Sequence, residues 1–241
     1  MLTQATHWLE IVAIALDVIL LGRLLLLRLY RLYVFITLAC VLAVFFDAVV
    51  LWLDADVKSA GMVFIYSRFL YAFLFPLIAW DVFEEVKAQV AKLRRLAIIR
   101  LVSGLVFACL FGFIVTAFTD TADASGTPSG DSSPLTNLGL IFWAGSSTAT
   151  LAFLWTLHRQ TRAQKIDLPN NTHVWMLFWE LSLLYEVFYC FWLLSYSLLK
   201  STAPYVELLF FVYGIAITAW CVFKLRAVPA GVPSAPANAG L

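Results

Sequence analysis

Charged residues are scarce in this sequence. Of its 241 residues only 13% are Asp, Glu, Lys or Arg, whereas 63% are hydrophobic. Soluble domains usually carry about 25% charged residues, so a chain this apolar cannot cover a water-exposed surface. The formal net charge of +1 also excludes the strongly basic face that a nucleic-acid-binding protein needs. We therefore expect the lipid bilayer to be the main partner of the chain.

Cysteines and catalytic motifs are scarce as well. The cysteines lie one by one in separate apolar runs, whereas a disulfide framework or a zinc site needs thiols that cluster. Metalloprotease, Walker and nucleophile-elbow patterns are absent. We therefore expect no metal and no cofactor, and an enzyme is not favoured, although an intramembrane hydrolase stays open. The cysteines, expected to be small buried packing residues, are Cys40, Cys109, Cys190 and Cys221.

Long apolar stretches are what the sequence has in place of charge. A helix that crosses a bilayer needs about 20 largely apolar residues, and seven stretches meet that length. The sequence predicts an all-α, polytopic membrane protein, with a single bundle of seven transmembrane helices over residues 1–226. The predicted spans are residues 8–27, 33–53, 62–83, 98–118, 137–157, 174–199 and 204–225.

The basic residues predict the direction of the spans. All but Lys58, Arg68 and Lys200 of the 16 lysines and arginines fall near connections on one side of the membrane. Because such residues are retained in the cytoplasm, we expect the N-terminus outside, the C-terminus in the cytoplasm, and a bacterial inner-membrane location. Tryptophans near the span ends, Trp143 and Trp175 among them, are expected at the membrane interface.

The segments between the spans carry further signals. Residues 119–136 and 227–241 are rich in small, polar or Pro/Gly residues, and predict a flexible outer loop and a disordered cytoplasmic tail. Residues 84–96 place apolar residues at helical spacing between charges, so the third helix is expected to continue into the cytoplasm, against anionic lipid or a protein partner. Small residues at every fourth position predict close helix packing, in the bundle or in a homodimer. They are Gly104, Ala108 and Gly112.

Charged side chains inside the spans are the candidates for function. Each costs about 2.5–3.5 kcal/mol to insert, so each needs a partner or a water-filled cavity. Four of them lie in the outer half or the middle of the predicted spans, and Tyr189 shares a helical stripe with one of them. They either line one ligand or ion cavity that opens to the outside, or form separate hydrogen-bonded pairs. The residues of this predicted cavity are Asp17, Asp47, Arg68, Glu186 and Tyr189.

Depth along the helices predicts partners for some of these charges. Asp47 and Arg68 lie about two turns from the outer ends of adjacent spans, so we expect them to pair. The pair is either a structural ion pair or part of an anion site, because guanidinium presents a fork of donors to carboxylate or phosphate. Asp81 is expected to pair with arginines at the inner end of its span. His158 and His173 are expected to be polar anchors at the interface.

Two segments carry a resemblance. The hairpin Arg28-Leu29-Tyr30-Arg31-Leu32-Tyr33-Val34-Phe35 and the helix end Trp80-Asp81-Val82-Phe83-Glu84-Glu85 resemble a family of uncharacterised bacterial seven-helix integral membrane proteins of similar length. The resemblance covers most of the chain and implies the fold but no activity. The layout also resembles the seven-helix sensor regions attached to some bacterial histidine kinases, from which this sequence departs because it carries no kinase domain.

These observations leave three functions open. The first is a sensor or accessory protein with an outward-facing polar cavity and a cytoplasmic protein partner. The second is a small transporter or ion-translocating protein that uses Asp17, Asp47 and Glu186; transporters commonly contain repeats and broken helices, and neither is evident here. The third is a structural subunit of a larger membrane complex.

Overall fold

The computed structural model describes residues 2–52, 57–87, 99, 102–103, 106, 134–194 and 203–227. Within these residues the regular structure is entirely helical, as predicted, with six α-helices and one short 3-10 helix. The elements are α1 (Leu2–Leu26), η1 (Leu29–Arg31), α2 (Val34–Trp52), α3 (Val57–Val86), α5 (Pro134–Ala163), α6 (Asn170–Leu194) and α8 (Ala203–Lys224).

The surface of the bundle is apolar enough for lipid. Three helical stretches in the described chain are long and apolar enough to cross a membrane: Val34–Trp52, Met62–Val86 and Tyr205–Lys224. Large apolar side chains also point outward, and Trp8 and Phe223 are 68% and 82% exposed. Soluble monomers rarely expose large contiguous apolar patches. The helices and their surface therefore fit a membrane protein.

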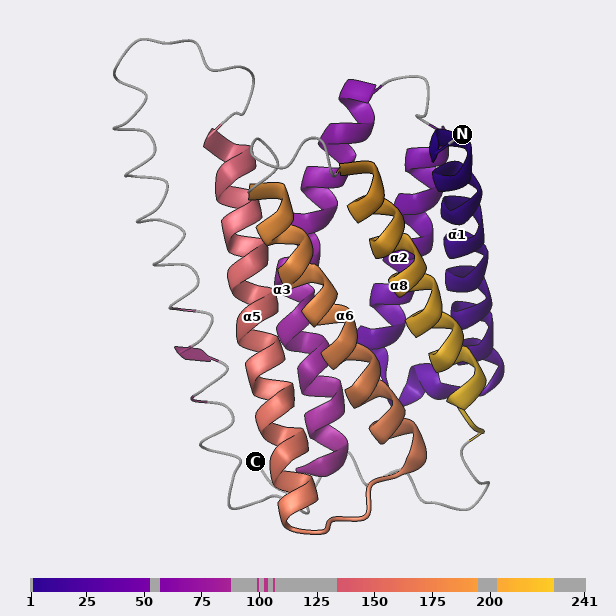
Figure 1. Cartoon of the computed structure of the whole chain (residues 1–241). Coiled ribbons are helices and arrows are strands. Elements are labelled where there is room, and N and C mark those ends of the chain that lie inside the picture. Colours follow the sequence, from indigo (N-terminus) through magenta and orange to yellow (C-terminus); the bar gives the residue numbers. More distant parts are fainter. Residues whose placement is uncertain are drawn as a thin grey trace.

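The helices stand side by side and close into a ring (Figure 1). The order around the ring is α1, α2, α3, α5, α6 and α8, and α8 packs back against α1, while α3 also reaches α6 across the ring. Helices α1, α3, α5 and α8 run in one direction and α2 and α6 in the other. We call the end where α1, α3, α5 and α8 finish the basic end, after Arg28, Arg31, Arg162, Lys165, Lys224 and Arg226, and the opposite end the far end.

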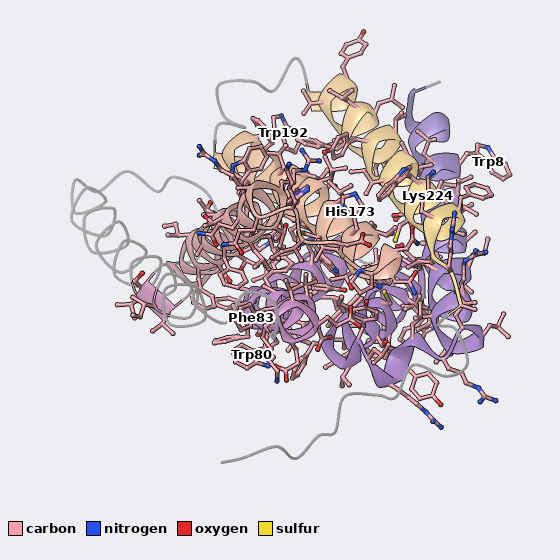
Figure 2. All side chains as sticks on the ribbon, turned by 90° about the horizontal axis from the view of Figure 1, so that it is seen from below. Trp8, Trp80, Phe83, His173, Trp192 and Lys224 are labelled. Atoms are coloured by element: carbon pink, nitrogen blue, oxygen red, sulfur yellow. The ribbon has the colours of Figure 1, made fainter. Side chains whose placement is uncertain are left out.

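Side chains separate into an inner and an outer set. In the view from the basic end, Trp8 and Trp80 lie at the periphery and point away from the bundle (Figure 2). Phe83, one turn after Trp80, is 1% exposed and packs inward. Trp175, predicted at the interface, is fully buried near the basic end, where it faces the ring and packs on Tyr33 with ring centroids 6.0 Å apart.

Helix α3 is fixed to α5 at a proline. Pro76 lies inside α3 and has no N–H, so it cannot bond the carbonyl of Ala72 one turn earlier. Ser146 of α5 donates its hydroxyl to that carbonyl instead. Close approach continues one turn earlier on α3, at Phe69, where a Cβ added to Gly139 of α5 would lie 2.6 Å from the Phe69 ring. The two helices therefore pack tightly where α3 lacks an internal hydrogen bond.

Two helices end on cationic residues in the left-handed conformation. Lys165 follows α5 with φ 51°, and Arg28 follows α1 with φ 56°. After α5, the N–H of Ile166 donates to Thr161 O at 3.0 Å and that of Lys165 to Arg162 O at 3.1 Å. This is the Schellman arrangement, in which glycine is the usual left-handed residue. The cap ends α5 and turns the chain toward α6.

Several sequence predictions lie wholly or partly outside the described residues. The span 98–118, with Gly104, Ala108 and Gly112, is one of them, and so is most of the tail 227–241. The predicted loop 119–136 is too long at its end, because α5 begins at Pro134; proline suits the first turn of a helix, where its missing N–H has no intrahelical partner. The predicted extension 84–96 is described only as far as Lys87.

Candidate functional site

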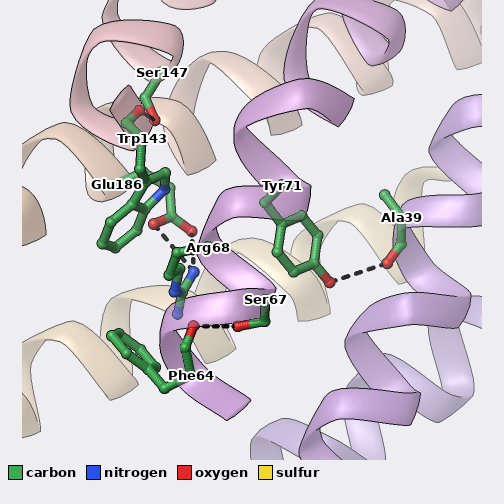
Figure 3. A network of polar contacts seen from close by, with 8 residues as sticks. All are labelled: Ala39, Phe64, Ser67, Arg68, Tyr71, Trp143, Ser147 and Glu186. Carbon is green, nitrogen blue, oxygen red and sulfur yellow. Dashed lines mark hydrogen bonds and ion pairs between the residues drawn. The ribbon is translucent and has the colours of Figure 1, made fainter. Parts of the chain in front are cut away.

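Arg68 of α3 and Glu186 of α6 form an ion pair across the ring (Figure 3). The Nη1 atom of Arg68 lies 3.2 Å from Oε1 and 3.4 Å from Oε2 of Glu186. The two side chains are only 22% and 15% exposed. A buried guanidinium cannot lose its proton and needs a partner. The carboxylate of Glu186 supplies it.

Two aromatic rings hold the guanidinium of Arg68. Its carbon lies 4.7 Å from the centroid of Phe64 and 4.5 Å from that of Trp143. Cations over aromatic faces gain up to about 2 kcal/mol when they are desolvated. Trp143, predicted at the membrane interface, is fully buried, and its indole packs on the charge of Arg68 inside the bundle.

Two donors at this site have no acceptor in the described part of the chain. They are Nε of Arg68 and Nε1 of Trp143, and both atoms are buried. A buried donor without a partner costs about 1–3 kcal/mol. Nη1 of Arg68 already donates to Glu186, so these two atoms are the donors in excess at the site. Such a site suits an anionic or carbonyl-bearing ligand.

The structure brings three of the five predicted cavity residues into direct contact around Trp143. Tyr189 packs on Trp143 with ring centroids 6.1 Å apart, so it joins Arg68 and Glu186. Asp47 on α2 interacts by charge with Asp17 on α1 and with Arg68. Asp47 and Arg68 do not form the predicted direct ion pair, because Arg68 takes Glu186 as its partner.

At the basic end, Glu85 of α3 contacts α6 and the residue that precedes α2. Its Oε2 accepts a 2.5 Å hydrogen bond from the hydroxyl of Tyr33, which precedes α2. The same oxygen accepts the hydroxyl of Thr172 in the first turn of α6. Tyr33 and Thr172 are buried, at 1% and 0% exposure. This cluster is a second polar link between α3 and α6.

The carboxylate of Asp81, a residue of α3, caps the first turn of α2. Its Oδ2 accepts the N–H groups of Phe35 at 2.6 Å and Ile36 at 3.0 Å. The first N–H groups of a helix have no intrahelical acceptor, and a carboxylate there also meets the positive end of the helix dipole. The prediction that Asp81 pairs with arginines was wrong for this reason. The two segments that carried the resemblance thus contact each other here.

His158 of α5 and Glu180 of α6 form a buried pair that the sequence did not predict. Nδ1 of His158 lies 2.9 Å from Oε2 of Glu180, and the residues are 7% and 6% exposed. The rings of His173 and His158 meet edge to face, with their centroids 5.7 Å apart. Burial, with His158 and Arg162 nearby, lowers the pKa of His173, which precedes the predicted span 174–199. The sequence feature that could have predicted this pair is one imidazole, His158, and one carboxylate, Glu180, in the inner halves of consecutive predicted spans.

The end of α8 is tied to its neighbours by backbone carbonyls. Arg23 of α1 donates to Leu225 O at 2.7 Å. Asn171 of α6 donates to Arg226 O at 2.7 Å and accepts the Arg226 N–H at 2.9 Å. These bonds place Arg226 beside the first turn of α6.

Cysteines and metal ligands follow a simple pattern in the described chain. Cys40, Cys190 and Cys221 are free and buried, as predicted, and Cys109 lies outside the described residues. No three His, Cys, Asp or Glu side chains in the described part gather as metal ligands.

In the comparisons with known proteins, no family model, no curated protein and no solved structure matches the chain.

Proposed function

We propose that the chain is a seven-helix sensor or accessory protein of a bacterial inner membrane. It would bind a small anionic ligand around Arg68 in the outer half of the bundle and pass the change to a cytoplasmic partner at the basic end. The observation that carries this proposal is that α3 and α6 are joined at two depths. One link is Arg68–Glu186 and the other is Glu85–Thr172.

In this proposal the predicted span 98–118 is the seventh crossing, added to the six described helices. The proposed direction rests on the basic residues. The described lysines and arginines, apart from Lys58 and Arg68, gather at the basic end, which the positive-inside rule assigns to the cytoplasm.

The two links span most of the membrane thickness. Arg68 and Glu85 are separated on α3 by a length of roughly 25 Å at ~1.5 Å per residue, close to the ~30 Å of a hydrocarbon core. A ligand that changes the outer link therefore changes the restraint on α6 along its length. The inner link, with Tyr33, lies beside the first turns of α2 and α6. A partner that binds at the basic end could detect a change in the position of α6 there.

Ligand chemistry follows from the donors. A carboxylate or phosphate would accept Nε of Arg68 and Nε1 of Trp143 and compete with Glu186 for the guanidinium. Glu186 would then lose its fixed partner, which frees α6 from α3. A ligand shifts an equilibrium only by its differential affinity for the two states. Competition for one guanidinium supplies that difference.

The experiment measures the distance between α3 and α6 at the basic end. Spin labels at Glu84 and Asn170, both exposed, report it by pulsed electron paramagnetic resonance, with the native cysteines replaced. Glu186→Gln neutralises the outer link, and Glu207→Gln is the matched control near the start of α8. The proposal expects a changed distance distribution for Glu186→Gln alone. Identical distributions in all three proteins would refute the coupling.

A transporter is the second candidate, because Asp17 and Asp47 on adjacent helices interact by charge. Facing carboxylates inside a membrane commonly mark ion or proton pathways. In liposomes that hold a pH-sensitive dye, a transporter predicts proton flux that Asp17→Asn and Glu186→Gln abolish. A sensor predicts the same slow leak for both variants, the unmodified protein and empty liposomes.

A further inference from the structure

A pocket of about 380 Å³ lies at the basic end, apart from the Arg68 site. It is formed by the last turns of α5, the connecting turn and the first residues of α6. Pockets for small molecules usually measure ~300–1,000 Å³. The volume is therefore that of a small-molecule site, and the residues around it indicate what it binds.

Cations line this pocket. Arg162 in the last turn of α5 and Lys165 in the turn both contribute to its wall. Lys165 occupies the left-handed position where glycine is usual, a position that strains a residue with a side chain. The cap itself does not require a lysine. Its charge is thus placed in the pocket wall at a cost to the backbone.

The start of α6 adds backbone donors. Asn170, the first residue of α6, lines the pocket. The first N–H groups of a helix lack intrahelical acceptors and carry the positive end of the dipole, an arrangement that suits phosphate. The side chain of Asn170 donates away from these groups, to Lys224 O.

His158 is an independent sign of a ligand. It lines the pocket although it is only 7% exposed. Glu180 holds its Nδ1, and its Nε2 has no hydrogen-bond partner within the described chain. With Nδ1 held, Nε2 is the ring atom left to bind a ligand. A carboxylate on one imidazole nitrogen fixes the orientation in which the other meets a ligand.

The charge balance of the pocket is positive. Asp167 is the one carboxylate among the residues that line it. Arg162 and Lys165 exceed Asp167 by one charge, and the α6 N-terminus adds to that excess. Neither a metal cation nor an amine suits such a surface.

The geometry points to a phosphate-binding site in this pocket, with Arg162, Lys165 and the α6 N-terminus as its donors and the unpaired Nε2 of His158 as a further polar atom. The ligand class is a phosphomonoester, either a soluble one or the headgroup of an anionic lipid. Both sources present the same oxygens at the basic end. The site does not require the sensor role of the Arg68 pair.

The experiment titrates inorganic phosphate into the full chain in dodecyl maltoside, with binding followed by calorimetry. The test variant is Arg162→Gln/Lys165→Gly, in which glycine keeps the left-handed turn. The matched control is Arg159→Gln/Arg28→Gly, which removes an arginine from the same helix and a left-handed cation at the same end. Neither control residue lines the pocket.

We expect saturable binding that the test variant weakens about tenfold or more, since hydrogen bonds to charged groups contribute about 1.5–3 kcal/mol each. The control should change affinity by about twofold at most, because neither side chain lines the pocket and exposed charges are screened by salt. No saturable binding by the unmodified chain, or equal losses in both variants, would overturn the proposal.

A second arm identifies the source of the phosphate. The chain is placed in nanodiscs of phosphatidylcholine with or without phosphatidate, and inorganic phosphate is titrated again. Phosphatidate that weakens apparent phosphate binding to the unmodified chain, but not the residual binding of the test variant, identifies the lipid headgroup. Unchanged binding identifies a soluble phosphomonoester. Both results presuppose the site, and equal weakening in the unmodified and test proteins contradicts it.

Discussion

Replacing Glu186 by leucine should destabilise the bundle more than any other single change to a polar group in its interior. The substitution leaves the guanidinium of Arg68 between Phe64 and Trp143, and it cannot lose its proton. Breaking a buried ion pair from one side costs about 3–5 kcal/mol, and insertion of an arginine at mid-membrane costs a similar ~2.5–3.5 kcal/mol. The two cation–π contacts survive in this variant, so they do not add to the loss.

Two companion variants separate charge from packing. Glu186→Gln keeps an oxygen that accepts Nη1 of Arg68 and should cost less than Glu186→Leu. Arg68→Met/Glu186→Leu removes both charges, and buried pairs replaced by apolar residues are often neutral in stability. Because Met also contacts aromatic rings favourably, the double variant should recover at least about half of the loss.

The assay is unfolding by dodecyl sulfate in mixed dodecyl maltoside micelles, followed by tryptophan fluorescence. We expect the midpoint to fall furthest for Glu186→Leu and to rise again in the double variant. Additive losses in the double variant would refute the view that Arg68 and Glu186 stabilise each other. Losses below about 1 kcal/mol would mean that the pair is solvated like a surface pair.

Three further predictions concern the basic end. Asp81→Ala should lower stability by about 1–2 kcal/mol and speed amide exchange at the start of α2, because the N–H of Phe35 loses its acceptor; unchanged exchange there would contradict the cap. Tyr33→Phe should cost about 1.5–3 kcal/mol in the same unfolding assay, since its hydroxyl donates to the charged Glu85, and a neutral result would mean that water replaces the bond. Lys165→Gly should raise stability by about 1 kcal/mol because it relieves a left-handed φ; a loss would show that the lysine side chain stabilises the turn.

The sequence predicts how deep a residue lies better than which residue it meets. Apolar runs and basic connections predicted the helices that the structure describes, with errors of a few residues at their ends. Depth alone suggested Asp47 as the partner of Arg68, because adjacent helices bring them to one level. The rotation of α3 decides instead that Arg68 faces α6 and Glu186. Rotation depends on packing, such as the contact of Gly139 with Phe69, that no local pattern encodes.

The inward orientation of Trp143 and His158 was not predicted for a related reason. Both are amphipathic, so a position near a span end predicts the membrane interface. Trp143 and His158 instead face inward, where Arg68 and Glu180 offer partners worth more than the headgroup region. Identifying such partners requires knowing that α5 lies between α3 and α6 in the ring.

The central proposal is a seven-span bundle whose basic end lies in the cytoplasm, because the proposed sensor role places its protein partner at that end. Alkaline phosphatase, which is active only outside the cytoplasm, tests it when fused to the chain after Asp123 or after Lys165. The account predicts an active enzyme at Asp123 and an inactive one at Lys165. The reverse pair of results would contradict the direction, and equal activity at both positions would contradict the count of crossings.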